Sequence, residues 1–302
     1  MIDFLKYRWL YATVSVLFFF AFVGGYFYKA KENASGNAFV YSVEFTGGLE
    51  VLYSLSQPVA GEKIVEILEK SGISGVVVRV FTDTSDVIVR VPLRSLEGSV
   101  EKMAESMRDL LMQELPGVSV EIQKTDAITA GVGETMRWKS LQAVVVGLLL
   151  MLIYIAWRFW SFAFAAGAVF ALFHDVIVIL SFFLFFNFEI SLNVIGAVLA
   201  VLGYSINDTI VIFSRIRENI VRLPSKSLYD VVNISLNETL RRTLLTSFAT
   251  TLVVVPLAIF GGEVLRTLSF ALLIGFVFGT YSSIYIASPV MMLLYKKSKA
   301  HK

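Results

Sequence analysis

The sequence predicts a polytopic α-helical membrane protein, with six transmembrane helices and one exported ferredoxin-like α+β domain (βαββαβ) between helices 1 and 2. Three observations support this prediction. The 302 residues are 56% hydrophobic and only 17% charged, values outside the range of soluble globular chains. The apolar residues gather in long segments. One soluble-looking stretch, residues 29–138, separates the first of these segments from the others.

Each membrane span needs about 20 mostly apolar residues. Six segments meet this requirement: 9–28, 139–157, 162–186, 190–213, 243–260 and 266–294. The first apolar run is longer than the hydrophobic region of a signal peptide and is followed by no convincing cleavage site. We therefore expect it to remain as an uncleaved anchor.

Basic residues predict the orientation of these spans, because they resist translocation. They cluster before span 1, between spans 2 and 3, between spans 4 and 5, and after span 6: Lys6, Arg8, Arg158, Arg215, Arg217, Arg222, Lys226, Arg241, Arg242, Lys296, Lys297, Lys299 and Lys302. The short loops on the opposite side hold almost no basic residues, and Arg266 is the exception. Both termini are therefore expected in the cytoplasm, with residues 29–138 outside.

This orientation divides the chain into four parts. Residues 1–28 form a cytoplasmic tail and helix 1, residues 29–138 the exported domain, residues 139–294 helices 2–6, and residues 295–302 a basic cytoplasmic tail. The cytoplasmic stretch 214–242 mixes bases with apolar residues and is broken at Pro224, which fits two short amphipathic helices on the membrane surface. A docking surface for a cytoplasmic partner fits the same composition.

The exported domain shows alternating strand patterns over 39–55, 75–81, 86–91 and 118–124. Helical spacing covers 61–71 and 95–115. The order βαββαβ is that of a split-βαβ, ferredoxin-like domain. Such a fold hosts many functions, and a domain that serves only as a structural spacer fits the sequence equally well.

The composition excludes several kinds of chemistry. Cysteine is absent, there are two histidines, and the net charge is only +2. No Gly-rich phosphate loop, metal-spaced His cluster or Ser/His/Asp set occurs in the sequence. The sequence therefore predicts neither a cofactor, a bound metal, a nucleic-acid partner nor an enzyme.

A carboxylate, Asp208, lies within the apolar span 190–213. At helical spacing it belongs to a continuous face of small and polar residues: Asn193, Gly196, Ala197, Ala200, Gly203, Tyr204, Asn207 and Asp208. Small residues let helices approach closely, and a charge at the centre of a bilayer costs about 2.5–3.5 kcal/mol. We expect Asp208 to face other helices or a wet cavity, with Gly203 at a helix contact. A structural carboxylate capped by Asn207 or a hydroxyl fits the same pattern.

Three further groups are candidates in the spans. His174 and Asp175 fall near the middle of span 3 and suit a proton relay, although an interior pair that only fixes packing fits as well. Arg242 shares a face with Thr246 and Thr250 and is the better candidate than Arg241 to meet a carboxylate. The alternative for Arg242 is a side chain that extends to the headgroups.

Span 6 repeats a small residue at every fourth position: Ala271, Gly275, Gly279, Ser283 and Ala287. This spacing predicts a close helix crossing rather than chemistry.

Several motifs resemble the SecF family of bacterial protein export. They are VEFTGG (43–48), ALFHDV (171–176), YSINDTIVIFSRIRE (204–218), LNETLRRTLLTS (236–247) and GTYSSIYIASP (279–289). Together they extend over nearly the whole chain and follow the family's order of six spans and one exported domain. The chain departs from the family's usual pattern at Glu44 and Ser214, where the family usually or often has Asp.

The resemblance implies a function that composition alone does not. Members of the SecF family work with SecD beside the SecYEG channel in the cytoplasmic (inner) membrane, where the proton-motive force helps to pull unfolded preproteins across. It also implies accessory membrane partners of the YajC and YidC types, and sodium in place of protons in some relatives. The family's Asp and Arg that match Asp208 and Arg242 are implicated in proton passage. We predict that Asn207, His174 and Asp175 belong with them to one proton-coupling group. Related resistance-nodulation-division transporters arrange two six-helix halves around a pseudo-two-fold axis, so one six-span chain resembles half of such an assembly.

Two other functions fit parts of the sequence. A proton-coupled exporter of small hydrophobic molecules would share the fold, but it usually carries two six-span halves in one chain. A membrane scaffold that conducts no protons would tolerate neutral replacements at both Asp208 and Arg242.

Overall fold

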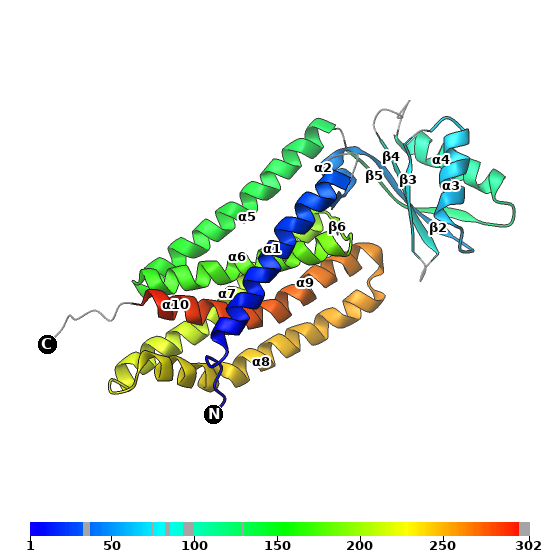
Figure 1. The fold of residues 1–302 in the computed structure, drawn as a ribbon. Helices are drawn as coiled ribbons and strands as arrows, with labels where there is room; N and C mark the ends of the chain where they lie inside the picture. The colour runs from blue at the N-terminus through cyan, green and yellow to red at the C-terminus, as the bar shows by residue number, and fades with distance from the viewer. Residues whose placement is uncertain (33–36, 74, 82–84, 93–99, 129, 296–302) are drawn as a thin grey trace. The chain divides into compact units, whose positions relative to one another are not determined.

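The computed structural model describes residues 1–32, 37–73, 75–81, 85–92, 100–128 and 130–295. The chain divides into two compact units, a helical unit of Met1–Val40 with Leu141–Lys302 and an α+β unit of Tyr41–Ser140 (Figure 1). The predicted basic tail 295–302 lies outside the described residues after Tyr295.

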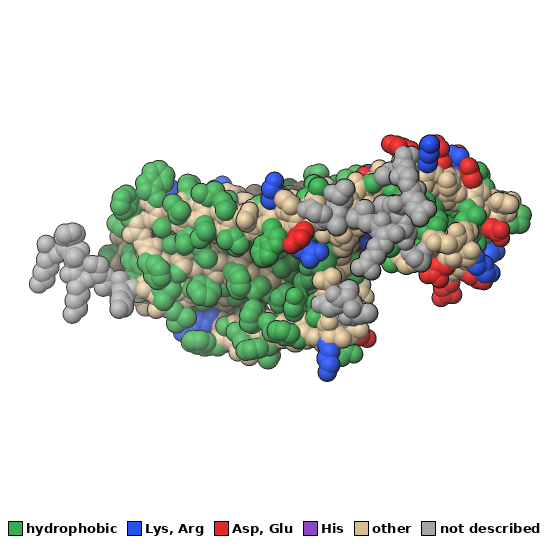
Figure 2. All heavy atoms as spheres, turned by 90° about the horizontal axis from the view of Figure 1, so that it is seen from above, with side chains coloured by type: hydrophobic (Ala, Val, Ile, Leu, Met, Phe, Trp, Pro, Cys, Tyr) green, Lys and Arg blue, Asp and Glu red, His purple; other side chains and the backbone are tan. Residues whose placement is uncertain are grey.

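Among the described residues, six helical segments are long and apolar enough to cross a membrane, which confirms the predicted spans. They are α1 (Arg8–Glu32), α5 (Ala130–Phe159), α6 (Phe162–Phe185), α7 (Leu192–Arg222), α8 (Leu228–Phe260) and the run of α9 (Gly262–Ser282), η2 (Ser283–Ala287) and α10 (Ser288–Leu294). The short strand β6 (Glu189–Ile190) precedes α7. Hydrophobic side chains cover the face of the helical unit seen in Figure 2, as expected for a surface in contact with lipid.

The stretch between spans 4 and 5 differs from the prediction. Residues 214–222 continue α7 and residues 228–240 begin α8, so two separate amphipathic helices do not form. The interruption covers residues 223–227, because Pro224 disfavours helical geometry in the preceding Leu223, which has φ −121° and ψ 59°. Ser227 caps α8 by accepting the backbone N–H of Asp230 at 3.1 Å. The two helix ends are joined where Asn219 Nδ2 donates to Ser235 Oγ at 3.0 Å.

The spans differ in how much this chain buries them. About half of the apolar window of α6 (56%) and α7 (50%) is buried, against none of α1 and 11% of α5. Helix α7 packs on α6, α8, α9 and η2 and is the centre of the unit. Gly275 of α9 is required there, because a Cβ at this position would come within 2.2 Å of the Val201 side chain on α7. The close crossing predicted for span 6 is therefore a contact with α7.

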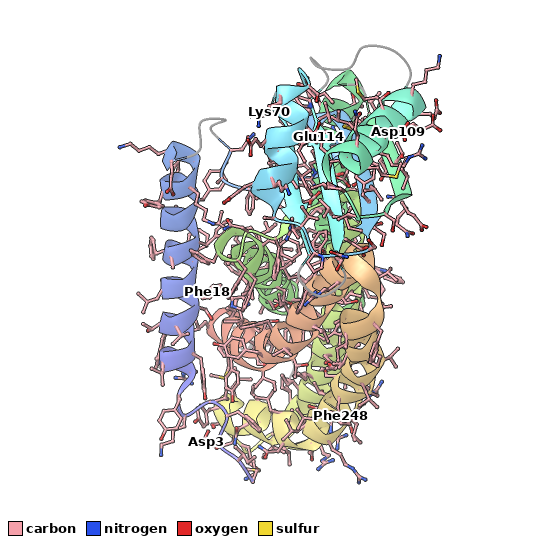
Figure 3. The ribbon with its side chains drawn as sticks, turned by 90° about the vertical axis from the view of Figure 1, so that its right-hand side faces the viewer. Asp3, Phe18, Lys70, Asp109, Glu114 and Phe248 are labelled. Atoms are coloured by element: carbon pink, nitrogen blue, oxygen red, sulfur yellow. The ribbon has the colours of Figure 1, made fainter. Side chains whose placement is uncertain are left out.

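The segment before α1 is bound to α8 by its backbone. Asn237 donates to the carbonyl of Ile2 at 2.7 Å and accepts the Ile2 N–H at 2.8 Å. Asn233 accepts the N–H of Phe4 at 2.9 Å, and Tyr229 donates to Asp3 at 2.7 Å. Asp3 is labelled beside the first turns of α8 in Figure 3. We call Tyr229, Asn233 and Asn237 the N-terminal clamp; they lie four residues apart and so share one face of α8.

The α+β unit has the predicted order. It contains β2 (Gly48–Leu55), α3 (Gly61–Lys70), β3 (Val77–Val80), β4 (Asp86–Val91), α4 (Val100–Glu114) and β5 (Val120–Ile128). The sheet order is β3-β4-β2-β5 with antiparallel neighbours, the split-βαβ topology. Residues 93–99 of the predicted helix 95–115 lie outside the described residues.

The first predicted strand, 39–55, is wrong in its N-terminal half. That region holds the two-residue β1 (Val40–Tyr41) and the short helix α2 (Val43–Thr46), and β2 begins only at Gly48. Gly47 and Gly48 have φ angles of 73° and 130°, which side chains rarely adopt, so the chain turns between α2 and β2.

One face of the sheet packs on α3 and α4. Its core contains Leu49, Val51, Tyr53, Leu55, Ile64, Leu68, Met107 and Leu111. The buried Tyr53 donates its hydroxyl proton to the carbonyl of Ala104 at 2.9 Å, and burial raises the pKa of this phenol. Charged residues such as Lys70 and Asp109 lie on the outer sides of α3 and α4 (Figure 3).

Candidate functional site

Asp208 lies on α7 inside the helical unit and is only 3% exposed. Its Oδ2 atom is buried and has no hydrogen-bond partner. The hydroxyl of Ser247 on α8 lies beside the carboxyl group, within reach to donate to it. A buried carboxylate oxygen without a donor is unusual, because the loss of hydration is then uncompensated.

A group of hydroxyls surrounds Ser247. The oxygens of Ser247 and Thr280 on α9 are 2.6 Å apart. Tyr204, one turn before Asp208 on α7, donates to Ser247 Oγ at 3.3 Å. Thr250 Oγ1 on α8 lies 3.4 Å from the Tyr204 hydroxyl. We call Tyr204, Ser247, Thr250 and Thr280 the hydroxyl cluster.

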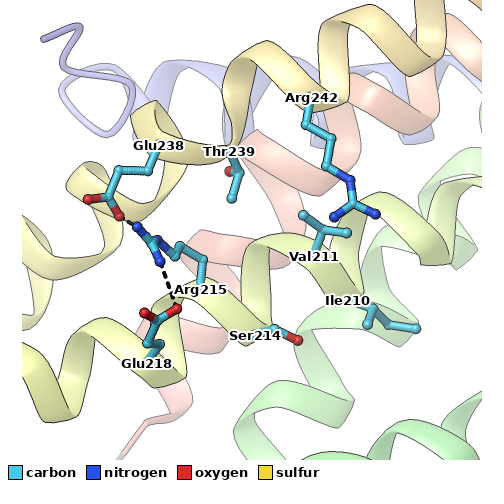
Figure 4. Close-up of a pocket in the computed structure, with 8 residues that line it drawn as sticks. All are labelled: Ile210, Val211, Ser214, Arg215, Glu218, Glu238, Thr239 and Arg242. Carbon is cyan, nitrogen blue, oxygen red and sulfur yellow. Dashed lines mark hydrogen bonds and ion pairs between the residues drawn. The ribbon is translucent and has the colours of Figure 1, made fainter.

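Arg242 is exposed and forms no ion pair with Asp208 or any other described residue. Its side chain extends from α8 toward Ile210 and Val211 of α7 (Figure 4). It lines a pocket of about 410 Å³ between α7 and α8, together with Ile210, Val211, Ser214, Arg215, Glu218, Glu238 and Thr239. Arg241 is not among these residues. The site thus holds a buried carboxylate and, nearby on the adjacent helix, a cation that faces a cavity.

Charged side chains hold the wall of this pocket. Arg215 Nε donates to Glu238 at 2.7 Å, and another guanidinium nitrogen of Arg215 donates to Glu218 at 2.7 Å (Figure 4). Both glutamates are thereby bonded to Arg215, whereas Arg242 has no carboxylate partner among the described residues. This leaves Arg242 as the cation in the pocket that is available to pair.

His174 and Asp175 lie together on α6, with Nδ1 of His174 3.5 Å from Oδ1 of Asp175. Asp175 is fully buried, and Ser205 of α7 donates to its Oδ2 at 2.6 Å. The hydroxyl of Ser282 on α9 lies beside this carboxylate and donates to the carbonyl of Gly279 at 3.1 Å. The His174 ring lies 5.8 Å from the ring of Tyr281. Both oxygens of the Asp175 carboxylate therefore have a partner, Oδ1 with His174 and Oδ2 with Ser205.

Asn207 and Gly203 do not turn inward in this chain. Both are exposed, as are Asn193, Gly196 and Ala200 on the same side of α7. A Cβ placed on Gly196 or Gly203 would meet nothing within 4 Å. We call these five residues the open face of α7; contact at Gly203 stays a prediction that needs a second helix.

Gly279 and Ser283 lie where α9 crosses α7. A Cβ at Gly279 would be 3.1 Å from Cβ of Ser205, and Ser283 Oγ is 3.0 Å from Thr209 Oγ1. Ser283 also begins the π-helical turn η2, where Ser288 donates to its carbonyl at 3.1 Å. Single π turns inside α-helices are frequent at functional sites.

Sequence reasoning missed Ser205, Ser247, Thr280 and Ser282 as members of the site. Single serines and threonines are common in membrane helices, so none of them stands out by type. The signal available was position, because each falls within one or two turns of a residue already selected on its own or a neighbouring helix.

Comparisons with known proteins agree on one family. Residues 110–297 match the family model of the protein export membrane protein SecD/SecF, C-terminal region. The chain is 38% identical to the protein translocase subunit SecF of Rhodothermus marinus, over 86% of this chain and 85% of that protein. It is 33% identical to SecF of Rickettsia rickettsii, over 96% and 90%. The crystal structure of SecDF, a translocon-associated membrane protein from Thermus thermophilus, superimposes with a TM-score of 0.84 at 31% identity.

That superposition covers 97% of this chain, which spans 38% of the SecDF chain. A second structure, SecDF in the super-membrane-facing form, matches over the same share with a TM-score of 0.68. Fold and site together define a multi-pass membrane protein with one inserted α+β domain and carboxylates buried between its helices. The chain belongs to the SecF family of protein translocase subunits, which are transport proteins of protein export and not enzymes.

Proposed function

We propose that this chain works with SecD in one complex that uses the proton-motive force to promote preprotein translocation, and that Asp208 takes up and releases the proton. The observation that carries the proposal is the buried Oδ2 of Asp208, which has no hydrogen-bond partner. A charged carboxylate in this position is costly, and protonation removes the cost. The charge state of Asp208 is therefore coupled to the packing of the helices around it.

Arg242 is the partner of this carboxylate in the charged state. It lines the pocket between α7 and α8 and has no ion pair of its own among the described residues. A modest shift of α8 along α7 would bring the guanidinium toward Asp208, and protonation of Asp208 would release it. Each proton that crosses the membrane supplies about 2.3 kcal/mol per 100 mV, enough to change the population of two helix arrangements.

SecD is the proposed partner for the open face of α7. Small and amide side chains facing lipid gain little, whereas against another helix they allow close approach and interhelical hydrogen bonds. The SecDF chain of Thermus thermophilus is much longer than this one, which leaves room in that protein for a second set of helices. The open face adjoins Asp208, so a helix of SecD there would complete the surroundings of the carboxylate.

The remaining assignments follow from the distribution of charge and from family membership. Both termini lie in the cytoplasm of a bacterial cell and the α+β unit lies outside the inner membrane, because the basic residues flank the opposite ends of the spans. The SecYEG channel and the unfolded preprotein are the other partners, with accessory proteins of the YajC and YidC types. His174 and Asp175 belong to the same polar interior, and Asn207 to the contact with SecD.

The proposal is tested by replacing Asp208→Asn in the complex with SecD. We expect proton-motive-force-dependent translocation of a preprotein into inverted membrane vesicles to fall to the level without the complex. Co-purification of SecD should be unchanged, because Asn keeps the size of the side chain. Asp109→Asn, an equal change of charge on the surface of α4, serves as the control.

Full stimulation by the Asp208→Asn protein would exclude Asp208 as the proton carrier. Loss of both stimulation and SecD would instead indicate a structural carboxylate. Normal function of Asp208→Asn together with Arg242→Gln would favour a scaffold that conducts no protons.

A further inference from the structure

The hydroxyl cluster lies on the opposite side of Asp208 from Arg242 along the helices. Tyr204 precedes Asp208 by four residues on α7, a rise of about 6 Å toward the proposed outer side. Thr250 lies eight residues beyond Arg242 on the antiparallel helix α8, a rise of about 12 Å in the same direction. The pocket with Arg242 therefore occupies the inner side of the carboxylate, and the hydroxyls occupy its outer side.

We propose that Tyr204 and Ser247 relay protons to Asp208 from the outer half of the membrane; this rests on the proposed function of Asp208. A hydroxyl both donates and accepts, so a row of hydroxyls can pass a proton without holding a charge. Backbone carbonyls and apolar side chains cannot do so. Thr250, Tyr204 and Ser247 form such a row, with oxygens 3.4 Å and 3.3 Å apart. Thr250 also donates to the carbonyl of Thr246 at 2.8 Å, so its hydroxyl must rotate before it passes a proton to Tyr204.

The last step of the relay, from Ser247 to Asp208, requires the Ser247 hydroxyl to change its acceptor. Thr280 donates its proton to the carbonyl of Phe276 at 3.1 Å, so Ser247 is the donor in its 2.6 Å contact with Thr280. The single proton of Ser247 is then directed away from Asp208, consistent with the unpartnered Oδ2. Rotation of the Ser247 O–H group about the Cβ–Oγ bond redirects this proton to the carboxylate while the oxygen stays in place.

The transfer balances as follows. A proton arriving from the outer side binds the Tyr204 oxygen as Tyr204 gives its own proton to Ser247. Ser247 in turn gives its proton to Asp208, which becomes a neutral carboxylic acid. Both hydroxyls end with one proton each, and the net change is one proton moved to Asp208. Release toward the pocket of Arg242 restores the carboxylate.

Tyr204 offers a clean test, because its ring and its hydroxyl have separate contacts. The ring packs on Phe276 with centroids 4.5 Å apart, and Tyr204→Phe retains that contact. The experiment uses the complex with SecD in proteoliposomes and measures proton uptake with a pH-sensitive dye under an imposed membrane potential. Tyr154→Phe, an exposed tyrosine on α5, is the matched control.

We expect Tyr204→Phe to slow proton uptake about tenfold or more, as for loss of a positioned proton donor, with SecD co-purification unchanged. Ser247→Ala should reproduce the loss and Ser247→Thr should restore uptake, a pattern that altered packing would not give. The remaining uptake in Tyr204→Phe should also lose the solvent deuterium effect of the unmodified complex.

Unchanged uptake in both Tyr204→Phe and Ser247→Ala, with Asp208→Asn inactive, would overturn the relay and leave the proposed function intact. Unchanged uptake in Asp208→Asn would overturn both. If Tyr204→Phe fails to assemble with SecD, the comparison of Ser247→Ala with Ser247→Thr decides the matter.

Discussion

The two sides of α7 differ in how far this chain completes them. Toward α6 and α9, Ser205 and Thr209 are buried and hydrogen-bonded, and both oxygens of Asp175 opposite them have a partner, His174 or Ser205. Toward the open face, Gly196 and Gly203 meet nothing within 4 Å, and the neighbouring Asp208 has an oxygen without a donor. On the side toward α6 and α9, which we call the closed side, the polar groups find their partners within this chain. On the side of the open face, they require another molecule or a protonated Asp208.

The largest expected effect comes from breaking the closed side at Asp175. Asp175→Leu would leave the buried Ser205 hydroxyl without its acceptor and His174 without its carboxylate partner, at about 1–3 kcal/mol for each group. We expect the thermal unfolding midpoint of the purified complex to fall by several degrees. Asp208→Leu, measured in parallel, removes a carboxylate whose Oδ2 has no donor and should lower the midpoint much less; equal losses would contradict the distinction between the two sides.

A smaller loss is expected from Gly275→Val, at the crossing of α7 and α9. The added Cβ would come within 2.2 Å of the Val201 side chain, and overpacking of a close crossing costs about 1–3 kcal/mol. Thermal unfolding in detergent is again the measurement. Val201→Ala makes room beside Gly275 and should recover part of the loss, whereas no recovery would mean that the strain lies elsewhere.

The smallest effect on the chain itself is expected at the open face. Gly203→Leu meets no atom of this chain within 4 Å at Cβ, so the stability of the isolated subunit should change by no more than about 0.5 kcal/mol. Binding to SecD should nevertheless fall several-fold, because a bulky side chain prevents close helix approach. Co-purification from membranes measures this, with Leu252→Ala on the exposed side of α8 as the control. Retention of SecD at the normal level would exclude the open face as the contact.

Helical periodicity was sufficient to predict the spans and to select Asp208, since a carboxylate in an apolar run has few structural explanations. It also placed Asp208 and Gly203 on one face. That face extends across the boundary between the buried and the exposed side of α7, so Asp208 is buried while Asn207 beside it is exposed. The spacing does not reveal which side of that boundary each residue occupies. That depends on the rotation of α7 against α8 and α9, which is a tertiary property.

The hydroxyl cluster could not be predicted for a related reason. Tyr204, Ser247 and Thr280 come from three helices, and their approach depends on the level at which each helix starts. Two local predictions failed as well. The sequence predicts the break at Pro224 but not the continuity of α7 and α8 on either side, because charged residues at the ends of spans resemble separate surface helices. The predicted strand 39–55 includes the turn at Gly47 and Gly48, because the alternation of apolar residues continues on both sides of the two glycines.

The N-terminal clamp has a consequence for how this protein can vary. Asn233 and Asn237 bind the peptide groups of Ile2 and Phe4, not their side chains. Many residues at positions 2 and 4 would present the same N–H and carbonyl groups, whereas few side chains other than Asn combine a donor and an acceptor at that reach. The anchor for the start of the chain therefore depends strongly on α8, more than two hundred residues downstream, while positions 2 and 4 can vary without loss of these backbone bonds; Asp3 and Leu5 contribute side chains of their own.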